Sequence, residues 1–160
     1  MNGRSDQIKK TKINNNIEIV EVEKNSKKVV RSLQKLLPQL TTNYKSFDQN
    51  DLKEILDSES TRLFIAIDRT SENQIVGTFT LVIFRIPTGK IIRIEDVIVD
   101  ESRRGEGIGR AMMNHAFNFA KNAGNDKIEL YSHPSRIAAN KLYQSLNFKI
   151  IKSNVYRYKS

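Results

Sequence analysis

Three glycines and three arginines lie within the segment RRGEGIGR, residues 103–110. Glycine has no side chain, so the main-chain N–H groups at 105, 107 and 109 can approach a ligand closely. The apolar spacing after them predicts that a helix begins here, and the free N–H groups of a first helical turn bind anions. The segment therefore predicts a phosphate or pyrophosphate site, with positive charge from the arginines. The alternative is a glycine-rich strand-to-helix connection whose arginines are solvated.

The residues around the glycines indicate which of the known kinds of phosphate-binding loop the segment can form. A Walker-type loop needs Lys and then Ser or Thr after its last glycine, whereas Gly109 is followed by Arg110 and Ala111. A dinucleotide site needs G-x-G-x-x-G within repeated β-α-β units. The chain offers G-x-G-x-G, with Glu129 about twenty residues further on as a ribose-binding acid. The strands predicted before the loop do not fit such units, so a dinucleotide site stays a minor alternative.

Apolar periodicity predicts the elements that must position this loop. Alternation in IEIVEV predicts a strand at 17–22, and the apolar spacing of SKKVVRSLQKLLPQL predicts a helix capped by Ser26 that ends or bends at Pro38. A short helix follows at NDLKEILDS. The runs RLFIAID, IVGTFTLVIF and IIRIEDVIVD, separated by turn residues, predict three antiparallel strands.

Helices and strands alternate in the second half of the chain. GIGRAMMNHAFNFAKNAG predicts a helix ended by Gly124, KIELYS a short strand, and SRIAANKLYQSLNF a last helix capped by Ser135. FKII and NVYRY predict two terminal strands. The whole order, β-α-α-β-β-β-α-β-α-β-β, indicates the α+β class: a sandwich-like arrangement of helices on a mixed, mostly antiparallel central sheet.

The composition of the chain limits the kinds of protein it can be. A chain of 160 residues with 38% hydrophobic and 28% charged residues suits one globular domain, so we expect a disordered basic arm at 1–16 and a single domain at 17–160. No membrane segment or secretory signal is expected, because no apolar run is long enough. The chain has no cysteine and only two histidines, so no disulfide or metal site is expected, and a cytoplasmic location is the default.

The segment RRGEGIG resembles the R/Q-x-x-G-x-G/A signature of the GNAT superfamily of acyl-CoA N-acyltransferases, with Arg104, Gly107 and Gly109 at its defining positions. IEDVIVD resembles the central strand of that family, and SHPSRIAANKLYQSLNF resembles its later Asn-x-x-Tyr helix. The likeness covers about residues 17–158 and implies a splayed sheet, with acetyl-CoA between the central strand and its parallel neighbour. The chain has LNF where the family usually has LGF, but Asn147 tolerates a left-handed backbone.

The resemblance assigns the cofactor to three parts of the chain. It implies that the loop holds the pyrophosphate, that a strand bulge beside the pantetheine frees an N–H to polarise the thioester carbonyl, and that the last helix contacts the cofactor near its sulfur. The implied cofactor-binding residues are Val97, Ile98, Val99, Arg103, Arg104, Gly105, Glu106, Gly107, Ile108, Gly109, Arg110, Asn140 and Tyr143.

Two residues are candidates for proton transfer. The resemblance implies that Tyr143 is the acid for the departing thiolate, and a phenol, with a pKa of about 10, can donate to it; the residue pattern by itself favours a core aromatic residue. Glu95 is the candidate base or water-holder, and the adjacent Asp96 is expected to project to the opposite face of the strand. Similar enzymes that act on polyamines carry Glu-Asp here; the alternative is a partly solvated or ion-paired carboxylate. His133 is a weaker candidate base, and His115 is expected to be structural.

These observations predict an acetyl-CoA-dependent N-acetyltransferase that acts on a small amine, a polyamine or a lysine side chain. Direct transfer in a ternary complex is expected, because no cysteine exists to form an acyl-enzyme. Residues 38–52 are the expected lid over the acceptor, and the terminal strands allow a homodimer. A non-catalytic acyl-CoA sensor is one alternative. A nucleic-acid-binding module, suggested by the net charge of +9, is another, but no nucleic-acid motif supports it.

Overall fold

The computed structural model describes residues 12–13, 16–41, 43–125 and 127–158. Its strands are Lys12–Ile13 (β1), Ile17–Glu21 (β2), Thr61–Asp68 (β3), Gln74–Ile86 (β4), Gly89–Val99 (β5) and Ile128–Leu130 (β6). Its helices are Lys27–Leu36 (α1), Gln49–Asp57 (α2), Ile108–Asn122 (α3) and Ile137–Ser145 (α4), with short 3-10 helices at Leu37–Gln39 (η1) and Glu101–Arg103 (η2).

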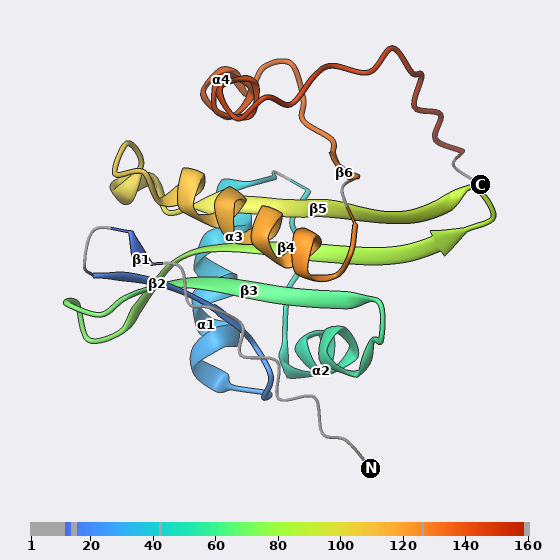
Figure 1. The fold of residues 1–160 in the computed structure, drawn as a ribbon. Coiled ribbons are helices and arrows are strands. Elements are labelled where there is room, and N and C mark those ends of the chain that lie inside the picture. Colours follow the sequence, from blue (N-terminus) through green and yellow to red (C-terminus); the bar gives the residue numbers. More distant parts are fainter. Residues whose placement is uncertain (1–11, 14–15, 42, 126, 159–160) are drawn as a thin grey trace.

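The strands form one mixed sheet in the order β1-β2-β3-β4-β5-β6 (Figure 1). Every neighbouring pair is antiparallel except β5 and β6, which run parallel. The α+β class and the three-stranded antiparallel meander predicted from the sequence are therefore confirmed. A parallel pair needs a crossover connection, and α3 supplies it.

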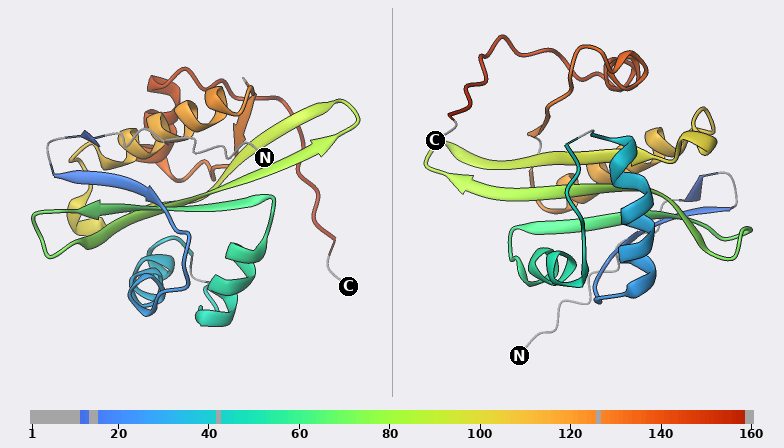
Figure 2. Two further views of the ribbon diagram at one scale, coloured as in Figure 1. Left: turned by 60° about the horizontal axis from the view of Figure 1, so that its bottom comes forward. Right: turned by 180° about the vertical axis from the view of Figure 1, so that it is seen from behind.

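Helices cover both faces of the sheet (Figure 2). On one face α3 packs over a core that includes Phe64, Phe79 and Met112. On the other face α1 and α2 pack over a second core that includes Leu52 and Leu63. Side chains alternate along each strand, so consecutive residues of β3 contribute to the two cores in turn.

Two predictions at helix ends are confirmed, and their physical causes are visible. The first helix ends at Leu36, and Pro38 lies in η1, since a proline has no N–H to continue the α-helical hydrogen bonds. Asn147 follows α4 with a φ of +67°, the left-handed conformation that asparagine tolerates.

The two predicted serine caps have different outcomes. Ser26 occupies the cap position of α1, although its side chain accepts no capping hydrogen bond within the described chain. The cap position of α4 belongs to Arg136 and not to Ser135. The Ser135 hydroxyl is instead hydrogen-bonded to Nδ1 of His133 at 2.7 Å, and this contact stabilises the turn before the helix.

The two ends of the chain differ from the prediction. Most of the predicted basic arm at 1–16 lies outside the described residues, but Lys12–Ile13 forms a strand paired with β2. The predicted terminal strands at FKII and NVYRY are wrong for the described residues up to 158, which form no strand after α4. Both runs have strand-like composition, but a strand also needs a partner whose N–H and C=O groups it can pair with.

A histidine of α3, His115, points into the core, in the structural role expected for it. His115 is 2% exposed, and its ring centroid lies 5.1 Å from that of Phe64 and 6.4 Å from that of Phe79. Neither ring nitrogen has a hydrogen-bond partner among the described residues. Burial lowers the pKa of His115 below its ordinary value, because the charged ring would lose its hydration.

This burial predicts that stability falls in mild acid. The unfolded state binds a proton on His115 more readily than the folded state does. The contribution of His115 to the free energy of unfolding is therefore complete above about pH 6.5 and decreases below it, by up to about 1.4 kcal/mol per pH unit. Urea unfolding at pH 7.5, 6.5 and 5.5 measures the slope, and His115→Leu should remove most of it. Equal slopes in the two proteins would contradict the assignment.

Candidate active site

The glycine loop, residues 103–110, connects β5 to α3 and begins within η2. Gly107 caps α3 with a φ of +82°, and Gly105 has a φ of +87°. A Cβ atom added at either position would meet no atom within 4 Å, so lack of space does not require glycine there. The left-handed backbone favours glycine, because residues with a Cβ disfavour that conformation.

This loop presents a row of unpaired main-chain donors. Within the described part of the chain, the main-chain N–H groups of residues 105–110 donate no hydrogen bond, whereas the N–H of Ala111 donates to the carbonyl of Gly107. Most of this row is exposed to solvent. Successive free N–H groups at a helix start form an anion-binding concavity, so the residues present fit a pyrophosphate.

Gly109 has a different role from the other two glycines. A Cβ atom there would lie 3.2 Å from Cδ2 of Leu142 and 3.8 Å from Cγ2 of Val99. The small residue therefore lets the first turn of α3 approach α4 and β5 closely. The sequence interpretation of Gly109 as a residue that bares its amide misses this packing role.

Two arginines of the loop, Arg104 and Arg110, form hydrogen bonds to neutral groups. The Nε of Arg104 donates to the main-chain oxygen of Val99 at 3.2 Å. A terminal guanidinium nitrogen of Arg110 donates to the hydroxyl of Ser145 at 2.7 Å. Both arginines are exposed, and neither has an ion pair within the described residues. They therefore supply the positive charge of the loop.

Arg103 and Asp68 anchor the loop from inside the fold. Arg103 pairs with Asp68 at 2.8 Å and with Glu106 at 2.7 Å, so its charge is neutralised within the protein. The Asp68 side chain is 4% exposed and also accepts from the hydroxyl and the N–H of Thr70. These donors, the Thr70 hydroxyl first, hold the pKa of Asp68 well below its ordinary value. The main-chain N–H groups of Arg103 and Arg104 close the η2 turn and are not free.

The parallel pairing of β5 and β6 is short. It ends at the pair formed by Ile94 and Leu130. Beyond that pair, residues 95–99 of β5 have no strand partner on this side within the described chain, so their outward main-chain groups can bind a ligand. The expected cofactor-binding positions at 97–99 lie in this stretch, next to the glycine loop.

A β-bulge lies in the same stretch, as the resemblance implies. Thr80 pairs with Glu95 and Thr78 with Ile98, so two residues of β5 oppose one residue of β4. Asp96, one of the two, has a φ of +49°. The bulge replaces the simple alternation predicted for Glu95 and Asp96, and it changes the direction of the main-chain groups that follow.

Glu95 lies on the face of the sheet that α1 and α2 cover. It is in register with Thr80, which is in register with Leu63 of the second core, and residues directly opposite each other share a face. Partial burial raises the pKa of the Glu95 carboxyl, while the positive charge of Arg93 opposes that shift. A carboxylate with a raised pKa is a better proton acceptor than a solvated one.

Tyr143 lies on the other face, within the core under α3. It is 8% exposed, and its ring makes an edge contact with Phe148, with centroids 5.9 Å apart. Burial raises the pKa of the Tyr143 phenol, so the group stays protonated over a wide pH range. Both the core role and the acid role considered from the sequence fit this position.

Asn140 contacts the loop that precedes its own helix. Its side-chain amide donates to the main-chain oxygen of His133 at 3.0 Å, which holds the connection from β6 to α4 in place. His133 itself is exposed, and its ring contacts Ser135. The sequence analysis assigned Asn140 to cofactor binding and did not predict this contact with the loop.

The segment after α1 is hydrogen-bonded to two other parts of the site. Arg136, at the start of α4, donates to the main-chain oxygen of Leu40 at 2.7 Å. The N–H of Glu101, in η2, donates to the side chain of Gln39 at 2.9 Å. Residues 39 and 40 therefore bridge the glycine loop and the last helix.

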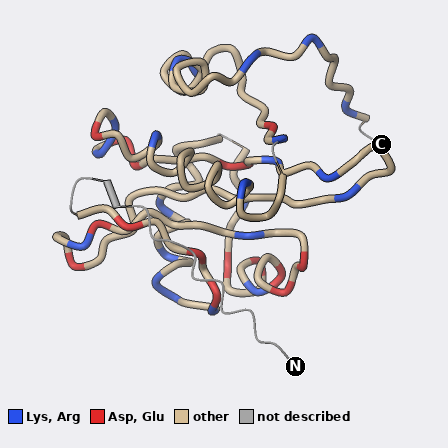
Figure 3. Tube along the Cα trace, viewed as in Figure 1, with Lys and Arg blue, Asp and Glu red and all other residues tan. Residues whose placement is uncertain are grey.

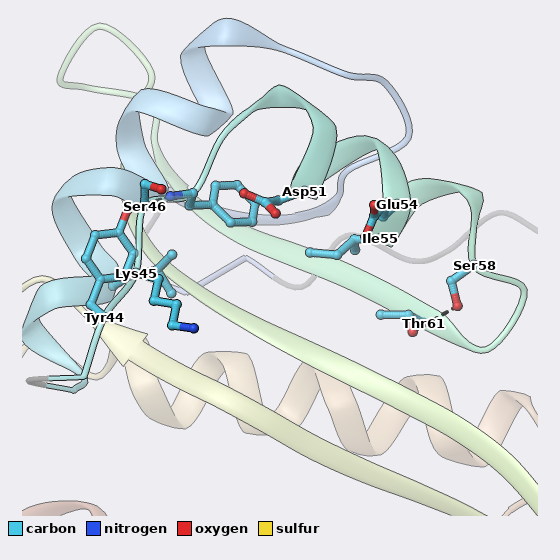
Figure 4. A pocket seen from close by; sticks show the side chains of 10 residues that line it. Tyr44, Lys45, Ser46, Asp51, Glu54, Ile55, Ser58 and Thr61 are labelled. Carbon is cyan, nitrogen blue, oxygen red and sulfur yellow. Dashed lines mark hydrogen bonds between the residues drawn. The ribbon is translucent and has the colours of Figure 1, made fainter.

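A pocket of about 540 Å³ lies between residues 44–47, α2 and the start of β3 (Figure 4). Its wall includes part of the 38–52 region that the sequence marks as an acceptor lid. Sequence reasoning missed the contribution of β3, because strand periodicity alone does not tell which residues border a hollow. The lining residues are Leu37, Tyr44, Lys45, Ser46, Phe47, Asp51, Glu54, Ile55, Ser58 and Thr61.

Two kinds of feature are absent from the described residues. None of the helices there combines the length and the apolar character needed to cross a membrane. No group of three or more potential ligand side chains in that part of the chain could hold a metal ion.

Comparison with known proteins gives a family match. Residues 29–148 match the model of the Acetyltransferase (GNAT) family. The chain is 33% identical over 81 residues to N-acetyltransferase 8B of Homo sapiens, a match that covers 49% of this chain and 36% of that protein. The matched part thus spans about a third of the length of this curated relative.

Solved structures share the fold. An aminoglycoside acetyltransferase from an uncultured soil metagenomic sample, in complex with sisomicin, superposes with a TM-score of 0.79 and 20% identity over 93% of this chain and 99% of that one. A putative acetyltransferase from Agrobacterium tumefaciens has a TM-score of 0.75 and 23% identity over 88% and 99% of the two chains. AAC(6')-Iy, in complex with a bisubstrate analog, has a TM-score of 0.71 and 18% identity over 90% and 98%.

The bulge predicts how substitutions at Asp96 affect stability. Asp96→Val should lower the free energy of unfolding by about 1–2 kcal/mol, because a β-branched residue disfavours a left-handed backbone. Asp96→Gly should retain the stability of the original chain, since glycine adopts that backbone readily. Urea unfolding of the three proteins tests this. Equal losses in both variants would show that the carboxylate, and not the backbone conformation, matters there.

Proposed function

Because this chain belongs to the acetyltransferase (GNAT) family, we propose that it transfers the acetyl group of acetyl-CoA to a primary amine, directly and within a ternary complex. The observation that carries the proposal is the row of free N–H groups at residues 105–110, next to the unpaired stretch of β5. We further propose that residues 17–160 form a single N-acetyltransferase domain. No cysteine is present to carry the acetyl group as an intermediate.

The glycine loop would bind the pyrophosphate of acetyl-CoA. Its free N–H groups lie at the start of α3, and Arg104 and Arg110 add positive charges that form no ion pair within the described residues. Arg103 acts indirectly, because its pairs with Asp68 and Glu106 hold the loop in its binding conformation. Main-chain groups of residues 97–99 would pair with the amides of the pantetheine arm, as a neighbouring strand would.

The acceptor amine would reach the thioester from the face of the sheet that carries Glu95. An amine with a pKa of about 10.4 must lose a proton before it attacks, which costs roughly 4–5 kcal/mol at pH 7. Glu95 accepts this proton, directly or through a water molecule. The amine nitrogen then bonds to the carbonyl carbon, the carbon–sulfur bond breaks, and the nitrogen loses its second proton to water to give the neutral amide.

Tyr143 completes the proton balance. Its phenol donates a proton to the departing thiolate and thereby yields free CoA. Glu95 and Tyr143 lie on opposite faces of the sheet, Glu95 on the face that α1 and α2 cover and Tyr143 in the core under α3, so the base would meet the amine while the acid would meet the sulfur. A free main-chain N–H of the bulged stretch polarises the carbonyl oxygen as charge develops on it.

A small polycationic amine is the acceptor class that the charges favour. Asp51 and Glu54 border the pocket beside α2, and Glu95 lies on the same face of the sheet. Carboxylates attract amines that carry more than one positive charge. Two proteins of similar fold, one in complex with sisomicin and one with the bisubstrate analog CoA-S-monomethyl-acetylneamine, support this acceptor class.

Release of CoA thiol in the presence of acetyl-CoA and a panel of amines tests the proposed function. We expect thiol release that depends on the amine and is greatest for polyamines and aminoglycosides. Gly107→Val should abolish release by weakening CoA binding, because valine cannot readily take the φ of +82°. Calorimetric CoA binding without release for any amine would contradict the enzymatic function, and absence of CoA binding would contradict the site.

Substitution of the two proton-transfer residues tests the mechanism. Tyr143→Phe should lower kcat by about 10²-fold or more and leave CoA affinity unchanged. Glu95→Gln should lower kcat/KM and remove the limb of the pH profile that rises with pH, whose midpoint lies above the ordinary pKa of glutamate because burial raises the pKa of Glu95. Asp96→Asn, a change in the neighbouring carboxylate, is the matched control and should keep that limb. Full activity of Tyr143→Phe would exclude the acid role.

A further inference from the structure

Helix α1 carries charge of one sign only. It has no acidic residue, and its basic residues are Lys27, Lys28, Arg31 and Lys35. The neighbouring helix α2, which lies beside it on the same side of the sheet, carries mainly acidic residues instead (Figures 2 and 3). Because both helices pack on the same core, packing does not explain why their outward faces differ in charge.

Three of these cations form a row along the outward face of α1, which we call the basic ridge: Lys27, Arg31 and Lys35. Successive members are four residues apart, and four residues advance an α-helix by about 6 Å and slightly more than one turn. All three residues are exposed, and none of them has an ion pair within the described residues. The opposite face of α1 is apolar and lies in the second core.

The charges of the basic ridge do not favour the helix that carries them. Cations near a helix N-terminus oppose the helix dipole, and Lys27 and Lys28 lie in the first turn, where no acidic residue offsets them. Like charges four residues apart also repel each other, and the ridge contains two such pairs. Local rules that are broken without a compensating gain within the fold are expected at functional surfaces. The basic ridge therefore indicates a surface that is kept for a partner.

We propose that the basic ridge binds the phosphate backbone of a nucleic acid, as an electrostatic contact that does not read the base sequence. One strand of a duplex carries a phosphate about every 3.4 Å along its axis, so a ridge about 12 Å long can meet three or four phosphates. Arg31, in the middle of the ridge, can bind a phosphate through two N–H groups at once. This interaction goes beyond the proposed acetyl transfer and does not depend on it.

The apolar residues of α1 favour a nucleic acid over the other anionic partners. A helix that lies on a membrane inserts apolar residues beside its basic ones. The apolar residues of α1, such as Val30 and Leu33, are buried in the second core instead, so the helix has none to insert. An acidic protein surface fits less well too, because protein interfaces have an apolar or aromatic centre and the outward face of α1 has neither.

Fluorescence anisotropy with a labelled DNA duplex of about 20 base pairs and a single-stranded RNA of similar length tests the proposal at about 50 and 200 mM salt. We expect binding at the lower salt concentration and a steep loss of affinity at the higher one. The probe that binds more tightly identifies the kind of nucleic acid.

A ridge variant measures the contribution of α1. Lys27→Gln with Arg31→Gln and Lys35→Gln should raise the dissociation constant at the lower salt concentration about tenfold or more. The slope of affinity against salt, both on logarithmic scales, should decrease by about 2–3, because each phosphate contact contributes about 0.9 for a duplex and about 0.7 for a single strand. Lys28 is kept, since its Nζ donates to the main-chain oxygen of Glu72 at 3.2 Å.

A matched control separates the basic ridge from the overall charge. Lys149→Gln with Lys152→Gln and Arg157→Gln removes three exposed positive charges from the segment after α4. Three charges taken from +9 leave +6, so both variants have the same net charge. We expect the control to bind both probes almost as the original chain does.

Thermal unfolding followed by circular dichroism checks that both variants keep the fold. The ridge variant should unfold at the same temperature as the original chain or at a higher one. The reason is that glutamine is a good helix former and the repulsion between the cations is removed.

Three outcomes would overturn the proposal. One is the absence of binding to both probes at the lower salt concentration. Another is an equal loss of affinity in the two variants, which would assign the binding to the overall charge. The third is binding to phosphatidylserine vesicles in place of both probes, which would assign the ridge to a membrane. Release of CoA thiol is measured separately, so failure of this proposal and failure of the proposed function remain distinguishable.

Discussion

The early end of the parallel pairing between β5 and β6 is the constraint on which the candidate site depends. Main-chain groups in a sheet need partners, and among the described residues the groups of β5 beyond Ile94 have no strand partner on one side. The bulge at Asp96 falls at the same place, so those groups also change direction. Two departures from regular strand geometry thus leave an edge within the sheet that a ligand can pair with, with α3 on one face and α1 and α2 on the other.

The loop at the end of β5 is ordered in advance by ion pairs. Arg103 links Asp68 of β3 to Glu106, so the conformation that bares the N–H groups does not have to form when a ligand arrives. Asp68 is nearly buried and Arg103 is partly buried, so this contact is less screened by solvent than a surface ion pair. The side chain of Arg103 thus fixes the loop to the body of the protein, while most of the main chain of the loop stays exposed to solvent.

The sequence was informative where a local rule determines the structure. Pro38 ends a helix, Asn147 takes a left-handed backbone, and the glycine spacing places a helix start, because each outcome depends on a few neighbouring residues. It was misleading where the outcome depends on distant parts of the chain. The contact of Gly109 with Leu142 and the pairing of Arg103 with Asp68 involve residues far apart in sequence, and so does the lack, among the described residues, of a partner for the predicted terminal strands.

Residues 39 and 40, which follow α1, connect two parts of the chain that are far apart in sequence. Gln39 accepts from the main chain of η2, and Leu40 accepts from Arg136 at the start of α4. A molecule on the α2 side that fixed residues 39 and 40 would also fix the two regions hydrogen-bonded to them, so part of the conformational entropy would be lost only once. Thermodynamic linkage would make the effect mutual, because binding of either ligand would strengthen the binding of the other by the same factor.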